Sequence, residues 1–296
     1  MKIFYADKDA LSFDSVVALG DFDGLHTAHM AIIRSAEEYG IKNGLKSGIL
    51  LFDGSFKNTK KITGIIQKTE ILKSENLYFA YICKFGEDFR KMTPDEFAGF
   101  LVKRLNVKAV CVGYDYTFGH NAEGNAAVLK VLGKKMGFDV IVTGRIEKDG
   151  NTVSSTYIRS LIENGGINKA NELLGRRFFI EGKVLSGYQN GRKMQIPTAN
   201  IEYSNESILP KSGVYAGITH IDGKEFKSVI NVGNNPTFGA DKITIESHVL
   251  NFYGDLYGKN VRVDFIEYLR SDKKFGCVEE LKAQIEQDIK KAEGMM

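Results

Sequence analysis

The feature that most constrains this fold is a change of hydrophobic pattern near Gly175. Before it, apolar runs of strand length alternate with stretches in which apolar residues recur every three or four positions. That order is typical of a parallel sheet covered by helices. Strands are predicted over residues 15–20, 48–52, 77–82, 108–113 and 138–143, and helices over 27–39, over 126–136 and from Pro94 onward. The first part of the chain is therefore predicted to be an α/β domain with helices on both faces of its sheet.

After Gly175, apolar and polar residues alternate, which is the period of a strand with one buried face. Strands are predicted over 178–184, 214–221, 226–232, 243–252 and 261–269, separated by glycine-rich turns. A helix over 278–292, with an apolar stripe of Leu281, Ile285 and Ile289, ends the chain. This part is predicted to be an antiparallel sheet or small β-barrel with a closing helix. The predicted domains are residues 1–170 and 171–296.

Composition narrows the function classes. Of the 296 residues, 43% are hydrophobic and 26% are charged, which fits a folded domain pair and excludes a disordered chain. The net charge of +3 is too small to indicate a nucleic-acid or membrane partner. The N-terminus lacks the apolar stretch of a signal peptide, and three widely spaced cysteines cannot form a disulfide framework. We therefore expect a cytoplasmic protein without a nucleic-acid or membrane partner.

The first motif with chemical content is residues 18–30, ALGDFDGLHTAHM. A strand ends at Gly20, a short loop follows, and a helix is predicted to start near His26. A helix N-terminus has free N–H groups and the positive end of the helix dipole, which suit a phosphate group. His26 and His29 would face the same side of the first turn and could stabilise charge at a reacting phosphorus atom. The alternative is a capped helix with two surface histidines.

A second candidate phosphate site is residues 153–159, VSSTYIR. Ser154, Ser155 and Thr156 open a predicted helix, and Arg159 follows one turn later. Hydroxyls, backbone N–H groups and a guanidinium could converge on a polyphosphate. The alternative is an N-cap beside a surface arginine.

A third candidate, residues 187–200, ends in PTAN. If this segment is extended, Thr198 and Asn200 project on one side, and their oxygens suit Mg²⁺ bound to nucleotide phosphates. The alternative is a loop that leads into a strand.

Two further positions could contact a second substrate. Glu246 is expected on the polar face of its strand, where a carboxylate could accept a proton from a substrate hydroxyl. The alternative is an ordinary strand face that contacts solvent. The loop 112–125 follows a strand, at the sheet edge where open α/β sheets bind ligands. There a flat ring could stack on Tyr116 or Phe118, although both rings could equally pack beneath the loop.

Taken together and in this order, the motifs resemble those of the bifunctional bacterial riboflavin kinase/FMN adenylyltransferases, or FAD synthetases. The resemblance covers nearly the whole chain. It is carried by residues 20–26 (GDFDGLH), 113–119 (GYDYTFG), 154–159 (SSTYIR), 197–200 (PTAN), 213–216 (GVYA), 231–238 (NVGNNPTF) and 254–258 (GDLYG). It implies a Rossmann-like nucleotidyltransferase domain followed by a β-barrel kinase domain.

The resemblance also implies two reactions. The second domain would transfer the γ-phosphate of ATP to riboflavin with Glu246 as the base, and Thr198 and Asn200 would hold Mg²⁺ with ATP. The first domain would join AMP from ATP to FMN, which gives FAD and pyrophosphate, with His26 and His29 as catalytic residues. The implied nucleotide-binding residues are Asp21, Phe22, Gly24, Ser154, Ser155, Thr156, Arg159, Gly182, Gly187 and Pro197, and the implied flavin-binding residues are Asp115, Tyr116 and Phe118.

Two departures from the family pattern fall in the first domain. Ala28 replaces the glycine of the family's H-x-G-H, and Gly54-Ser55-Phe56 replaces its P-H-P after the second strand. They leave open a riboflavin kinase with a weak or inactive adenylyltransferase domain. A non-catalytic flavin- or nucleotide-binding regulator is a further alternative.

Overall fold

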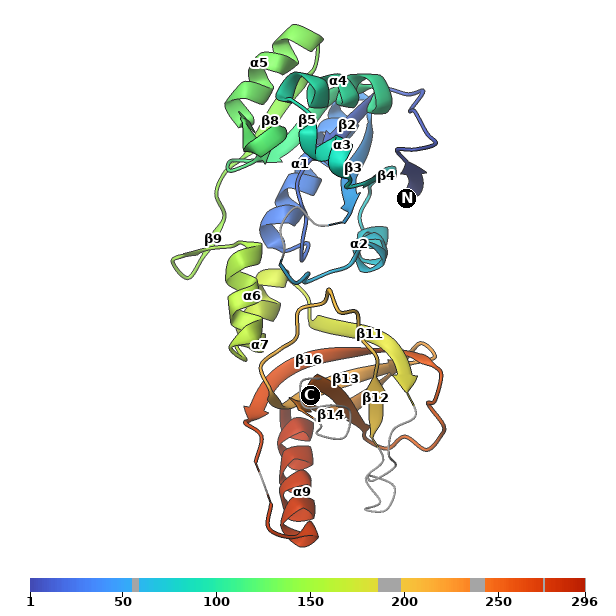
Figure 1. The fold of residues 1–296 in the computed structure, drawn as a ribbon, viewed down its shortest axis with the longest axis vertical. Coiled ribbons are helices and arrows are strands. Elements are labelled where there is room, and N and C mark those ends of the chain that lie inside the picture. Colours follow the sequence, from blue (N-terminus) through green and yellow to red (C-terminus); the bar gives the residue numbers. More distant parts are fainter. Residues whose placement is uncertain (55–58, 186–197, 235–242, 274, 296) are drawn as a thin grey trace. The chain divides into compact units, whose positions relative to one another are not determined.

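The computed structural model describes residues 1–54, 59–185, 198–234, 243–273 and 275–295. The chain divides into two compact units, Met1–Ser155 and Thr156–Met296 (Figure 1). Among the described residues, no helix has both the length and the apolar character needed to cross a membrane.

The first unit is built on a six-stranded parallel sheet. Its strands lie in the order β1 (Lys2–Tyr5), β4 (Phe79–Lys84), β3 (Lys46–Asp53), β2 (Ser15–Ala18), β5 (Val107–Gly113) and β8 (Asp139–Thr143). The predicted parallel sheet is therefore confirmed, and β1 adds an edge strand that was not predicted. The chain order reverses between β2 and β5, so the loops that follow these two strands share the edge where such sheets bind ligands.

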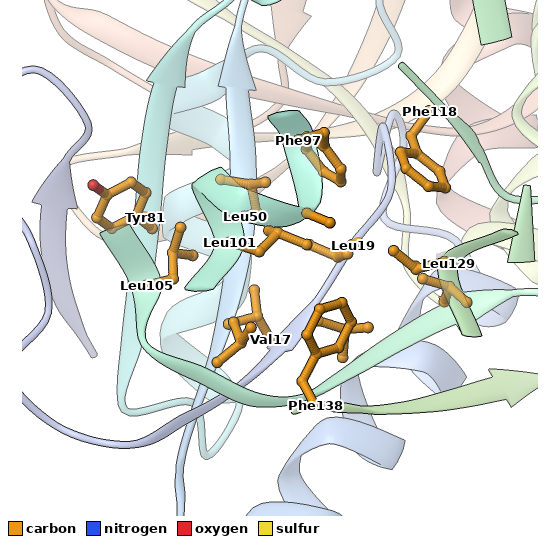
Figure 2. Close-up of a cluster of buried hydrophobic side chains, with 14 of the residues drawn as sticks. Val17, Leu19, Leu50, Tyr81, Phe97, Leu101, Leu105, Phe118, Leu129 and Phe138 are labelled. Carbon is orange, nitrogen blue, oxygen red and sulfur yellow. The ribbon is translucent and has the colours of Figure 1, made fainter. Parts of the chain in front are cut away.

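Helices cover both faces of this sheet. Alternate residues of the central strands enter two separate cores because successive side chains of a strand point to opposite faces. One core packs against α1 (Thr27–Asn43), α2 (Ile65–Ile71) and the 3₁₀ turn η1 (Leu72–Ser74). The other packs against α4 (Pro94–Leu105) and α5 (Ala126–Met136), with Leu101 and Leu129 among the buried side chains (Figure 2). Helix α4 begins where Thr93 caps it and Pro94 occupies its first turn.

Shorter elements complete the first unit. They are α3 (Glu87–Lys91), the 3₁₀ turn η2 (His120–Ala122) and two small antiparallel pairs, β6 (Thr117–Phe118) with β7 (Gly124–Asn125) and β9 (Glu147–Lys148) with β10 (Asn151–Thr152).

The second unit is a closed antiparallel barrel, which confirms the predicted barrel. Its strands follow the order β11 (Phe178–Leu185), β12 (Ala199–Ile201), β15 (Ile243–Val249), β14 (Lys224–Asn234), β13 (Gly213–Ile221) and β16 (Asn260–Arg270). Two helices, α6 (Ser155–Glu163) and α7 (Ile167–Leu174), precede it. Of the expected nucleotide-binding residues, Gly187 and Pro197 lie outside the described residues.

The closing helix α9 (Val278–Met295) covers part of the outer barrel wall. Ile289 and Ala292 pack in one cluster with Val214, Ala216 and Val229 of strands β13 and β14. On β15, the half-buried Glu246 and His248 alternate with the buried Ile245, Ser247 and Val249.

Candidate functional site

The loop of residues 20–26, here called the nucleotide loop, follows β2 and has an unusual backbone. Phe22 and Leu25 have positive φ values of 53° and 42°, and Gly24 has a φ of 85°. A positive φ is costly for residues other than glycine, so the surroundings must hold this shape. The side chains of Phe22 and Leu25 are buried in the core, which helps to hold this backbone shape.

The two histidines of the first motif lie together at the start of α1. His26 is the N-cap, and its Nδ1 accepts a hydrogen bond from the backbone N–H of His29 at 3.3 Å. Their rings stack with centroids 3.6 Å apart, and the ring of Phe22 meets that of His29 edge-on at 5.3 Å. Because Nδ1 of His26 is an acceptor, the neutral ring carries its proton on Nε2, where it can be donated.

Hydrogen bonds from other segments brace the nucleotide loop. The carboxylate of Asp23 accepts hydrogen bonds from the backbone N–H groups of Ile62 and Thr63, and the Thr63 hydroxyl accepts one from the N–H of Gly24. The hydroxyl of Ser155 donates to the carbonyl of Asp23 at 2.8 Å. The start of the second phosphate motif is therefore hydrogen-bonded to the first.

From Ser155 onward the second motif lies on α6, and Ser154 directly precedes this helix. Thr156 is exposed, whereas Ser154 and Arg159 are half-buried. Helix α6 begins at Ser155, so the predicted helix start within this motif is correct.

The loop after β5 holds the three expected flavin-binding residues in different surroundings. Asp115 is exposed and its carboxylate lies over Gly113, the last residue of β5. Phe118 is buried and packs against Phe97 at 5.2 Å, so its ring lies beneath the loop. Tyr116 stacks on Phe118 with ring centroids 5.7 Å apart, and burial raises the pKa of its hydroxyl.

In the barrel, strand register places three polar residues in one row across β12, β15 and β14. Asn200 is paired with Glu246, and Glu246 is paired in turn with Asn231. Directly paired residues of adjacent strands project to the same face, so these side chains are neighbours. All three are half-buried. The side-chain oxygen of Asn200 is buried and accepts no hydrogen bond from the part of the chain that the structure describes.

Two other residues of the barrel, Thr198 and Gly182, were expected to bind metal and nucleotide, respectively. Thr198 is half-buried and directly precedes β12. Gly182 lies on β11, where a Cβ would overlap the carbonyl oxygen of Glu202. Close strand packing therefore accounts for glycine at position 182.

Sequence reasoning assigned no role to Asn231, although it begins the motif NVGNNPTF. Its place beside Glu246 depends on the pairing of β14 with β15, which no local pattern specifies. It also assigned no role to Lys68, a lysine of α2 that lies against the nucleotide loop.

Comparison with known proteins assigns a class to each half. Residues 8–157 match the FAD synthetase family, and residues 174–296 match the riboflavin kinase family. The bifunctional riboflavin kinase/FMN adenylyltransferase of Bacillus subtilis is 32% identical over 94% of this chain and 91% of its own length. The enzyme of the same description from Escherichia coli is 32% identical over 92% of this chain and 90% of its own.

A solved structure has the same fold over the full length. It is a Streptococcus pneumoniae protein described as a macrolide-efflux protein, with a TM-score of 0.88, 28% identity and 98% coverage of both chains. The chain belongs to the family of bifunctional riboflavin kinase/FMN adenylyltransferases and carries both of its domains. The resemblance inferred from the motifs is thereby confirmed.

Proposed function

We propose that the barrel phosphorylates riboflavin with Glu246 as the general base, and that the nucleotide loop and the histidines at the start of α1 serve the adenylylation of FMN. The observation that carries the proposal is the row formed by Asn200, Glu246 and Asn231 on one barrel face. A carboxylate between two amides offers a proton acceptor flanked by groups that can orient a substrate hydroxyl and a phosphate. We assign the kinase to residues 171–296 and the adenylyltransferase to residues 1–170.

In the kinase reaction, a terminal hydroxyl of the ribityl chain attacks the γ-phosphorus of ATP and ADP leaves. Glu246 accepts the proton of that hydroxyl as the new O–P bond forms. Asn231, its neighbour on β14, can hold the hydroxyl or the carboxylate in the reactive orientation. The product is FMN.

The residues present fit an Mg²⁺ ion brought in with ATP. The buried oxygen of Asn200 has no hydrogen-bond partner among the described residues, and amide and hydroxyl oxygens suit this cation. Asn200 and Thr198 would hold the ion, whose charge would offset that of the phosphates. No cluster of three acidic, histidine or cysteine side chains among the described residues forms a separate metal site.

In the adenylyltransferase reaction, a phosphate oxygen of FMN attacks the α-phosphorus of ATP and pyrophosphate leaves. The backbone of the nucleotide loop and the free N–H groups at the start of α1 would bind the phosphates. His26, His29 and Arg159 would stabilise the negative charge that develops. Asp21, Gly24 and the hydroxyls of residues 154–156 would complete the nucleotide site, and Asp115 and Tyr116 would hold FMN.

We further propose that the enzyme works in the cytoplasm on small molecules alone. All three cysteines are free thiols, and Cys83 and Cys111 are buried. Burial raises the pKa of Cys83 to about 12 and that of Cys111 to about 11, so neither is a reactive thiolate.

The deciding experiment is the Glu246→Gln substitution followed by product analysis. The change keeps the side chain's shape and removes its proton acceptor, so FMN formation from riboflavin and Mg-ATP should fall by about 10²–10⁴-fold. FAD formation from FMN in the same preparation is the control and should be unchanged. A variant that phosphorylates riboflavin at nearly the normal rate would exclude Glu246 as the base. A wild-type chain that makes FMN and no FAD would show that its first domain is inactive.

A further inference from the structure

Lys68 is a buried lysine that contacts the nucleotide loop. It lies on α2 with only 5% of its surface exposed, and its Nζ donates a hydrogen bond to the carbonyl oxygen of Asp21 at 2.7 Å. A buried ammonium is costly unless charges and hydrogen-bond acceptors surround it. The stability of α2 alone therefore does not account for a lysine at this position.

Burial lowers the pKa of Lys68, and the nearby Lys61 adds to that effect, whereas the carboxylates of Asp21 and Asp23 oppose it by favouring the charged ammonium. Two carboxylates in a loop that receives phosphates would repel the ligand if no cation faced them. Lys68 supplies that cation from beneath the loop.

The hydrogen bond from Lys68 is made to a peptide group whose orientation affects the shape of the nucleotide loop. The carbonyl of Asp21 belongs to the peptide group directly before Phe22, and the orientation of that peptide group sets the φ of Phe22. That φ is 53°, in the left-handed region that a phenylalanine rarely adopts. Lys68 thus holds the first of the loop's two strained residues, while Thr63 holds Gly24 two residues later.

We propose that Lys68 is a positioning residue for FMN adenylylation: through the carbonyl of Asp21 it holds the nucleotide loop in the shape that receives the phosphates of ATP. This rests on the assignment of the loop to the adenylyltransferase reaction. Lys68 acts on ATP binding through the loop and has no part in riboflavin phosphorylation.

The test is Lys68→Met, assayed for FAD formation with ATP and FMN varied separately. The KM for ATP should rise at least about tenfold, because that is the effect expected from the loss of one hydrogen bond to a charged group. The KM for FMN and the rate of riboflavin phosphorylation should stay within about twofold of the wild type, since neither involves the loop. The matched control is Lys73→Met, which removes an exposed lysine paired with Glu70 just beyond α2 and should change nothing.

Two outcomes would overturn the proposal. If Lys68 were only structural, the methionine variant would lose active protein, so kcat would fall with the KM for ATP unchanged. Should that variant not fold, Lys68→Arg takes its place: it keeps a charged donor and should bind ATP within about threefold of the wild type. A folded arginine variant with the KM for ATP raised tenfold or more would equally exclude the role.

A further variant separates this proposal from the assignment on which it rests. His26→Ala should slow FAD formation by about 10²–10³-fold if the loop and the start of α1 form the site. A normal rate of FAD formation in His26→Ala would contradict the assignment of the nucleotide loop to the adenylyltransferase reaction. If His26→Ala slows FAD formation but Lys68→Met leaves the KM for ATP unchanged, the loop keeps its assignment and only the role of Lys68 is excluded.

Discussion

At the scale of single residues, the side-chain oxygen of Asn200 supports its place in the proposed kinase site. Its side-chain oxygen is buried with no hydrogen-bond partner among the described residues, next to the carboxylate of Glu246. A buried acceptor without a partner costs about 1–3 kcal/mol, so it is uncommon where nothing binds. In the proposed kinase site, a bound ligand would supply a partner for this oxygen and offset that cost.

Asn200→Ala should therefore separate stability from activity. The free energy of unfolding should stay within about 1 kcal/mol of the wild-type value, because an unpaired acceptor is removed along with its packing. The KM for Mg-ATP in riboflavin phosphorylation should rise, and added Mg²⁺ should restore part of the loss. Denaturant unfolding and initial rates at several Mg²⁺ concentrations provide the measurement. A large loss of stability with an unchanged KM for Mg-ATP would mean that Asn200 is a structural residue.

At the scale of elements, α9 is attached to the barrel by a buried ion pair as well as by its apolar stripe. Asp288 is only 1% exposed and receives hydrogen bonds from Nε and Nη2 of Arg270, the latter at 2.8 Å. The side-chain amide of Gln284, one turn earlier on the helix, also donates to Asp288 at 3.1 Å. This pairing fixes where α9 lies along the outer wall.

Removing Asp288 should loosen this attachment. Asp288→Ala leaves the guanidinium of Arg270 unpaired, so the barrel should lose roughly 2–4 kcal/mol, somewhat less than the loss for a fully buried pair because Arg270 is partly exposed. Thermal unfolding followed by circular dichroism measures the effect, and Glu286→Ala on the exposed side of the helix is the control. Replacing both partners, as in Arg270→Met with Asp288→Leu, should cost less than Asp288→Ala alone. Equal losses for the single and double variants would contradict this account.

At the scale of the whole molecule, α7 is built into the barrel unit. The side chain of Asn171 donates to the carbonyl of Phe265 at 2.9 Å and accepts from the N–H of Phe178 at 2.6 Å. On the same helix, Ile167, Ala170 and Leu173 are buried. A fragment that begins at residue 171 would therefore start inside α7 and lack part of its buried face.

Two fragments of the barrel should differ accordingly. Residues 156–296 and residues 171–296 should both convert riboflavin and Mg-ATP to FMN and leave FMN unchanged, because each keeps Asn200 and Glu246. The longer fragment should melt at least about 4 °C higher, since burial of an isoleucine such as Ile167 contributes about 1.5–3 kcal/mol. Thermal melts and product analysis of both fragments test this. A folded longer fragment that makes no FMN would show that the kinase site needs the first unit.

The sequence by itself determined the type of nearly every long element, the two kinds of domain and the motifs of both reactions. Each of these depends on residues close together in the chain. A period of two or of 3.6 reports which face of an element is apolar, and caps such as Thr93 and Asn125 mark where helices begin. The strand β12 was not predicted, because its three residues are too few to show a period, and the edge strand β1 was not predicted either.

Only the tertiary structure decided which distant residues meet. Lys68 and Asp288 are charged residues on helices, and local pattern places such residues on the solvent side. Both are buried because a partner reaches them from another segment: the carbonyl of Asp21 for Lys68, and the guanidinium of Arg270 for Asp288. The row of Asn200, Glu246 and Asn231 likewise arises from the register of three strands. Register is set by the closure of the whole barrel, whereas alternation along one strand determines only which of its two faces is buried.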